Sequence, residues 1–149
     1  MRLVVQRVTR ASVMVEGTET GSIGAGAVVL CGIGRGDDGA VVDRMAAKLL
    51  ALRYFEDAAG RTNLSIADAG GEYLVISQFT LLADVRRGRR PGFTDAAAPE
   101  QAEPLVERLV ARLEEAGHRV ATGRFGAEML VELVNDGPFT LVLDSDRDA

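Results

Sequence analysis

Residues 77–80 read Ser-Gln-Phe-Thr and bring three polar side chains to the end of an apolar run, residues 73–76. The run has the composition of a buried strand, so its polar end lies either in water or at the edge of a pocket. Hydroxyl and amide groups at a pocket edge can orient a polar substrate. The Ser77 and Thr80 hydroxyls are weak nucleophiles unless a base lies beside them. The residue types alone leave both interpretations open.

A second segment, residues 84–93, concentrates arginine in a chain whose formal net charge is -5. Its four arginines are Arg86, Arg87, Arg89 and Arg90. A solvated loop is one explanation. The other is a loop that holds phosphate, because guanidinium groups pair bidentately with phosphate oxygens. The negative net charge argues against a broad nucleic-acid coating but allows one local contact.

A third segment, residues 135–140, reads Asn-Asp-Gly-Pro-Phe-Thr between two predicted strands. An ordinary turn would explain these residue types. The bond between Gly137 and Pro138 can also be cis, as about 5–6% of X-Pro bonds are. The sequence does not decide the isomer.

A fourth segment, residues 34–39, matches G-x-G-x-x-G by letters. That pattern can bind a dinucleotide when it opens a helix after a strand. Here Asp37 and Asp38 would put two negative charges where the pyrophosphate would lie. A loop that ends in a helix N-cap is therefore the favoured interpretation.

Composition excludes several classes of chemistry. One cysteine, Cys31, permits no internal disulfide, and one histidine, His118, leaves a Ser-His-Asp triad or a zinc site without its usual residues. No apolar run approaches the roughly 20 residues of a membrane helix. The 149 residues, 47% of them apolar and 26% charged, suit one globular domain. We expect a single domain over residues 1–149 with a frayed tail at 144–149, in the cytoplasm, with no metal, no cofactor and no membrane contact.

Hydrophobic periodicity gives the elements that must position these segments. Two helices are predicted over residues 41–52 and 99–115, with Pro104 awkwardly placed in the second. Strands are predicted at residues 2–8, 12–15, 27–33, 53–55, 73–76, 120–122, 129–134 and 140–143. This order predicts an α+β fold with a mostly antiparallel sheet, curled into a partial barrel and covered by two main helices.

From residue 1 to about residue 144 the sequence resembles the D-aminoacyl-tRNA deacylase family. The resemblance is carried by Ser-Gln-Phe-Thr at 77–80 and Asn-Asp-Gly-Pro-Phe-Thr at 135–140, in that order. Further matching segments are residues 5–8, 10–12, 53–56, 63–64, 90–91 and 122–125. Two departures are local: Gly92 follows the Arg-Pro pair where the family usually has Ser, and Leu130 follows Met129 where it usually has Gln.

The resemblance implies a homodimer with its active site at the subunit interface. Ser77, Gln78, Phe79 and Thr80 would line the pocket beside the terminal adenosine of tRNA. Gly137 and Pro138, joined by a cis bond, would reach into the other subunit's pocket and exclude an L side chain. Arg7 would hold the Gly-Pro carbonyls in orientation, and Met129 would line the same region.

The implied activity is editing: hydrolysis of D-aminoacyl-tRNA and, because glycine has no side chain to exclude, of glycyl-tRNA mischarged on tRNA(Ala). In the family view, the terminal ribose 2'-hydroxyl activates water, and backbone amides near Phe79 and Thr80 hold the oxyanion. Thr80 as nucleophile is a rival mechanism. From the residues we add that Arg86, Arg87, Arg89 and Arg90 contact phosphates of the acceptor stem or CCA end. A non-catalytic module that binds tRNA or aminoacyl-adenosine, and a purely structural dimer, are the alternative functions.

Overall fold

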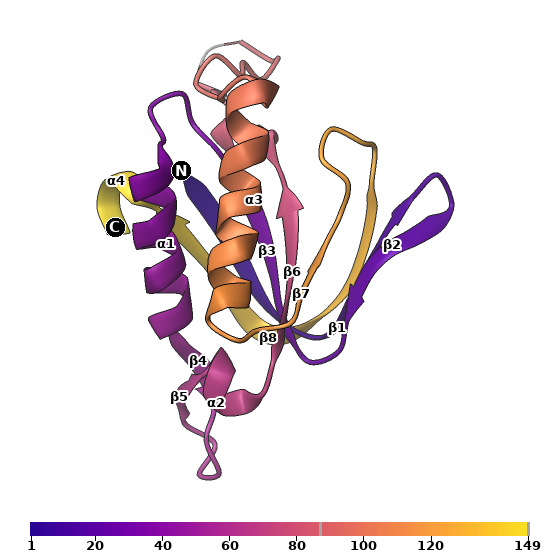
Figure 1. Ribbon diagram of the computed structural model, residues 1–149, viewed down its shortest axis with the longest axis vertical. Helices are drawn as coiled ribbons and strands as arrows, with labels where there is room; N and C mark the ends of the chain where they lie inside the picture. The colour runs from indigo at the N-terminus through magenta and orange to yellow at the C-terminus, as the bar shows by residue number, and fades with distance from the viewer. Residues whose placement is uncertain (87, 149) are drawn as a thin grey trace.

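The computed structural model describes residues 1–86 and 88–148, and its centre is a curled six-stranded sheet (Figure 1). The strands are β1 (Arg2–Val15), β2 (Thr18–Ile23), β3 (Gly26–Gly32), β6 (Glu72–Ser77), β7 (Val120–Thr122) and β8 (Leu130–Asp144). β1 pairs antiparallel with β3 in its first half, with β2 in its second half and with β8 along both. β1 and β8 were each predicted as two shorter strands, and each is continuous here.

The sheet is mixed: it has the predicted antiparallel pairing around β1, but it also contains parallel pairs that were not predicted. β3 and β6 pair parallel, and so do β6 and β7. A helix separates the strands of each parallel pair along the chain. A helical crossover brings the next strand back in the same direction, which a hairpin cannot do.

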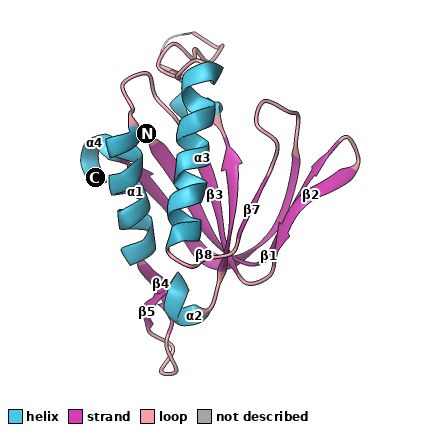
Figure 2. Ribbon diagram, in the orientation of Figure 1, coloured by secondary structure: helices cyan, strands magenta, loops and turns pink. Residues whose placement is uncertain are grey.

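The α+β class is confirmed, but the described residues form four α-helices where two main helices were predicted. They are α1 (Gly39–Ala51), α2 (Ile66–Ala69), α3 (Pro99–Glu115) and α4 (Ser145–Asp148), with a 3-10 helix η1 (Phe79–Leu82) after β6. A separate pair of short strands is formed by β4 (Arg53–Glu56) and β5 (Thr62–Ser65). The two long helices, α1 and α3, lie side by side across one face of the sheet (Figure 2). The segment expected to fray contributes α4, whose Ser145 amide donates to the Met1 carbonyl at 2.9 Å.

The glycine-rich segment before α1 is a loop with a helix N-cap, as predicted. Asp38 caps α1, and its side chain accepts from the Val41 amide at 2.9 Å. Asp37 faces inward, accepting from the Gly34 amide at 2.6 Å and pairing with the Met1 ammonium at 2.6 Å. Both carboxylates therefore already have partners: Asp38 binds the first turn of α1, and Asp37 binds the loop and Met1.

α3 starts at Pro99, a favoured first position, and continues through Pro104. The loss of one backbone hydrogen bond at Pro104 is tolerated because Leu109 and Leu113 are fully buried further along the same helix. Gly117, at φ 90°, follows the helix end and donates to the Glu114 carbonyl.

β3 and β6 are buried on both faces, which explains their continuous apolar runs. Val29 and Tyr73 pack with α1 and α3, whereas Val28 and Leu74 pack on the opposite face with β1. The sheet nearly closes on itself between β2 and β7, where Arg119 donates to the Ser22 carbonyl at 3.2 Å. The candidate site begins at the carboxyl ends of β3 and β6.

Of the helices formed by residues 1–86 and 88–148, none is long and apolar enough to cross a membrane.

Candidate active site

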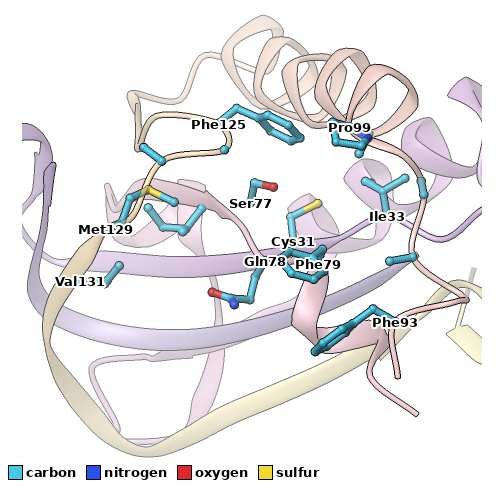
Figure 3. A pocket seen from close by; sticks show the side chains of 16 residues that line it. Cys31, Ile33, Ser77, Gln78, Phe79, Phe93, Pro99, Phe125, Met129 and Val131 are labelled. Atoms are coloured by element: carbon cyan, nitrogen blue, oxygen red, sulfur yellow. The ribbon is translucent and has the colours of Figure 1, made fainter. Parts of the chain in front are cut away.

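A cavity of about 530 Å³ opens at the carboxyl ends of β3 and β6, under the start of α3 and beside the β7–β8 loop (Figure 3). Four of the predicted site residues line it: Ser77, Gln78, Phe79 and Met129. Its other walls are Cys31, Ile33, Ile76, Phe93, Ala96, Ala97, Pro99, Ala102, Phe125, Gly126, Ala127 and Val131. The lining is largely apolar, with a few polar groups on one side, as is usual for a small-molecule site.

The parallel pairing of β3 and β6 places Ser77 at the cavity. Ser77 lies opposite Cys31 in the register, and the next amide, that of Gln78, donates to the Cys31 carbonyl at 2.8 Å. The chain then turns directly into η1. Gly32 permits this turn, because a Cβ there would lie 2.5 Å from the Leu82 side chain and 3.0 Å from the Gln78 carbonyl.

The Thr80 side chain lies outside the cavity lining and is exposed. Its hydroxyl oxygen accepts from the Gln78 side-chain amide at 2.5 Å. The backbone amides of Phe79 and Thr80 belong to the first turn of η1, where amides have no acceptor within the helix. No acceptor for either amide is found among the described residues.

The cavity lacks an ordinary catalytic base among the residues that the structure describes. Its lining there contains no His, Asp, Glu or Lys. The one histidine, His118, packs edge-on against Tyr73 with ring centroids 5.1 Å apart, and Tyr73 lies near the start of β6 whereas Ser77 ends it. Nucleophilic attack by a hydroxyl would therefore have no side-chain base to assist it.

Cys31 is the one titratable side chain in the described lining, and it is a poor nucleophile. Burial raises the pKa of its thiol from 9.0 to about 12, so the thiol stays protonated at neutral pH. We expect Cys31→Ala to retain activity, and iodoacetamide at neutral pH to leave the folded protein unmodified by mass. The thiol of the unfolded chain ionises at a lower pH than the buried thiol, because burial raises its pKa. The free energy of unfolding therefore falls as the pH rises above 9. Rapid alkylation with loss of activity would contradict this prediction.

The Gly137–Pro138 segment forms an excursion inside β8. Asn135 pairs with Val8 and Thr140 pairs with Gln6, so four residues of β8 stand opposite Arg7 alone. The Gly137–Pro138 bond is cis, and both residues are exposed. Neither of them lines the cavity of its own chain. Within one chain, the Gly137–Pro138 pair is therefore separate from the cavity that Ser77, Gln78, Phe79 and Met129 line.

Arg7 is 5% exposed and anchors this excursion. Its guanidinium donates to the Tyr54 carbonyl at 2.8 Å and to the Asp136 carbonyl at 3.1 Å, and it pairs with the Asp136 carboxylate at 3.0 Å. It also lies over the Phe139 ring, 4.8 Å from the centroid. The carbonyl that it holds belongs to Asp136, one residue before Gly137, rather than to Gly137 or Pro138 themselves.

Asn135 fixes the other side of the excursion, a role that the sequence analysis missed. Its side-chain amide donates to the Arg7 carbonyl at 2.8 Å and to the Phe139 carbonyl at 3.1 Å. The segment is thus held at both ends by side chains while its tip stays exposed. An asparagine two residues before a Gly-Pro pair is a typical loop-bracing residue.

The arginine-rich loop leaves the cavity wall after η1 and returns to it at Phe93. Asp84 and Gly92 form an antiparallel bridge at its base. The Arg86 guanidinium pairs with Asp84 at 2.8 Å and holds the pKa of that carboxyl well below its usual range. Arg89 and Arg90 are exposed. Arg87 lies outside the described residues.

Within residues 1–86 and 88–148 no group of three or more His, Cys, Asp or Glu side chains is arranged to hold a metal ion.

Comparisons with known proteins agree on one family. A family model described as D-Tyr-tRNA(Tyr) deacylase matches residues 4–144. A D-aminoacyl-tRNA deacylase of Anaeromyxobacter dehalogenans is 60% identical over 148 residues, which cover 99% of each chain. One of Symbiobacterium thermophilum is 58% identical over 147 residues, covering 99% of this chain and 97% of the relative.

Solved structures share the fold. A structure described as c-Myc DNA Unwinding Element Binding Protein has a TM-score of 0.90 and 42% identity, and the match covers 97% of this chain and 98% of that one. A probable eukaryotic D-amino acid tRNA deacylase has a TM-score of 0.82 over 95% of this chain and 97% of its own. At 17% identity this second structure supports the fold alone.

Proposed function

The chain belongs to the D-Tyr-tRNA(Tyr) deacylase family and is a hydrolase, and we propose that it cleaves the ester bond of D-aminoacyl-tRNA in the cavity beside Ser77. The observation that carries this proposal is a cavity whose described lining holds no ordinary base, next to η1, whose Phe79 and Thr80 amides have no acceptor among the described residues. An aminoacyl ester is already activated, so it needs a positioned water and a stabilised oxyanion more than a strong nucleophile. The macromolecular substrate is tRNA, and the activity belongs in the cytoplasm, where translation supplies aminoacyl-tRNA.

The attacking water is activated by the substrate's own 2'-hydroxyl. The backbone amides of Phe79 and Thr80 donate hydrogen bonds to the carbonyl oxygen of the ester, on which negative charge develops. Ser77 and Gln78 orient the terminal nucleoside, and Met129 closes the same wall of the cavity. No metal or cofactor takes part in this scheme.

Thr80→Ala tests the rival mechanism in which Thr80 is the nucleophile. We expect kcat to stay within about tenfold of the wild type, because the variant loses one hydrogen bond, from Gln78, and keeps its backbone amide. Single-turnover deacylation, with tRNA binding measured in parallel, gives the answer. Abolished turnover with intact tRNA binding would establish Thr80 as the nucleophile.

Selectivity for D substrates comes from a second copy of the chain. Gly137 and Pro138 are exposed at the tip of the β8 excursion and do not line their own cavity, so they are free to enter the cavity of another subunit. There the Gly-Pro carbonyls occupy the space of an L side chain. Glycine has no side chain to reject, so glycyl-tRNA(Ala) is also accepted. The protein in this scheme is a homodimer with two composite sites.

The exposed arginines of the loop between η1 and Phe93 bind phosphates of the acceptor stem or CCA end of the tRNA. We expect Arg89→Ala and Arg90→Ala each to flatten the plot of log binding constant against log salt by about 0.7–0.9. Arg86→Ala should change it less, because Asp84 already neutralises that guanidinium. Fluorescence titrations of tRNA at several salt concentrations measure the slopes, with Arg44→Ala on α1 as a control. Unchanged slopes for Arg89 and Arg90 would reject the contact.

The proposed function is tested by following deacylation of D-tyrosyl-tRNA and L-tyrosyl-tRNA by chelator-treated protein. We expect rapid loss of the D ester alone. If neither ester is lost while tRNA still binds, the chain is a binding module of this fold rather than an editing enzyme.

A further inference from the structure

We propose that Phe79 and Phe93 form a stacking platform for the nucleobase that precedes the terminal adenosine of the tRNA 3' end. This inference rests on the proposed function and adds a second nucleotide to the substrate site. It assigns a role to the Phe79 ring, which is separate from that of the Phe79 amide, and to Phe93, which the sequence analysis passed over.

The two rings meet at the cavity mouth. Their centroids are 5.0 Å apart and the ring planes are inclined by 67°, an edge-to-face pair. Figure 3 shows both side chains together at one rim of the cavity, away from Met129 and Phe125. An edge-to-face pair covers only part of the ring surfaces, so the remaining faces stay open to a planar ligand.

Both rings are more exposed than a structural role requires. Phe79 is 54% exposed and Phe93 is 36% exposed, whereas Phe55, Phe125 and Phe139 pack against the core. Exposed apolar surface that is contiguous with a cavity marks an interaction site more often than an accident of packing. Base stacking on aromatic rings is tolerant of sequence, because every base has a π-face.

The positive charge beside the two rings favours a nucleic-acid strand as the ligand. Phe79 and Phe93 flank the arginine-rich loop, whose Arg89 and Arg90 are exposed in a chain of net charge -5. A platform of rings next to guanidinium groups is the usual composition of a single-stranded nucleic-acid site. A base on the rings and its phosphate near the arginines would extend the strand away from the cavity, where the terminal nucleoside lies.

The test compares two esters, D-tyrosyl-adenosine and D-tyrosyl-CCA trinucleotide, and measures kcat/KM for each. We expect the wild type to prefer the trinucleotide and Phe93→Ala to lower that preference by about 10-fold. Phe93→Tyr should keep the preference because it keeps the ring. Val85→Ala is the matched control, since Val85 is an apolar residue of the same loop, 72% exposed and not aromatic.

A second measurement uses uncharged CCA trinucleotide and adenosine as ligands in calorimetric titrations. It applies even if no ester is hydrolysed, an outcome that would reject the proposed function alone. Loss of trinucleotide preference in Phe93→Ala supports the platform. An unchanged preference overturns it, as does a Phe93→Ala protein that becomes monomeric by light scattering and loses both esters equally, because the ring would then cover a second copy of the chain.

Discussion

Replacing Phe79 by proline is expected to lower kcat/KM for D-aminoacyl-tRNA by roughly 10²–10³ relative to Phe79→Ala, the usual effect of removing one oxyanion donor. Proline deletes the backbone N–H at this position, and alanine keeps it. Both variants remove the ring, so the difference between them isolates the amide. Steady-state kinetics with D-tyrosyl-tRNA gives the ratio.

The backbone accepts this substitution. Phe79 is the first residue of η1, a position that suits proline, and Gln78 before it has φ -147° and ψ 78°, outside the α region that a following proline disfavours. Thermal unfolding should therefore be similar for the two variants. Equal kcat/KM values for the proline and alanine proteins would show that the Phe79 amide does not stabilise the transition state.

Replacing Arg7 by alanine is expected to raise hydrolysis of L-aminoacyl-tRNA by about 10²-fold, because a misplacement of about 1 Å has effects of this size. Arg7 holds the Asp136 carbonyl and carboxylate directly before Gly137, so its loss should free the tip that we propose rejects L substrates. The variant also leaves the Tyr54 carbonyl without its donor, which should lower the free energy of unfolding by about 2 kcal/mol.

Arg10→Ala is the matched control for Arg7. Arg10 lies on the same strand, is exposed, and pairs with exposed Glu132 at 3.8 Å, so its removal should change neither selectivity nor stability by a measurable amount. The ratio of D to L deacylation rates and urea unfolding are measured for both variants. An unchanged ratio in Arg7→Ala would remove Arg7 from the selectivity mechanism.

Local patterns predicted the elements of this fold better than their pairing. The apolar stripes of α1 and α3 and the run of β6 are visible at short range, because each reflects one buried face. The parallel pairing of β3 with β6 depends on the crossover between them, and α1 in that crossover was the available signal. β8 was divided in two because Gly137 and Pro138 interrupt its pattern, whereas Arg7 and Asn135 keep the excursion within one strand.

The residues of the candidate site were predicted only where they are close together in the sequence. Ser77, Gln78 and Phe79 stand together in the sequence, so their neighbourhood in space followed from one strand end. Cys31, Phe93 and Phe125 reach the cavity from three distant segments, and apolar residues of this kind carry no chemical signal. The pairing of Arg86 with Asp84 was in principle visible, since an aspartate two residues before an arginine can neutralise it.

The composite site is tested most directly by mixing two defective proteins. Arg7→Ala protein, which is expected to hydrolyse both esters, is allowed to exchange subunits with an excess of Phe79→Pro protein, which is expected to hydrolyse neither at an appreciable rate. If the loop of one copy serves the pocket of the other, each functional pocket now faces an intact loop, and L-ester hydrolysis falls while D-ester hydrolysis persists. L-ester hydrolysis that stays unchanged on mixing would show that loop and pocket act within one chain.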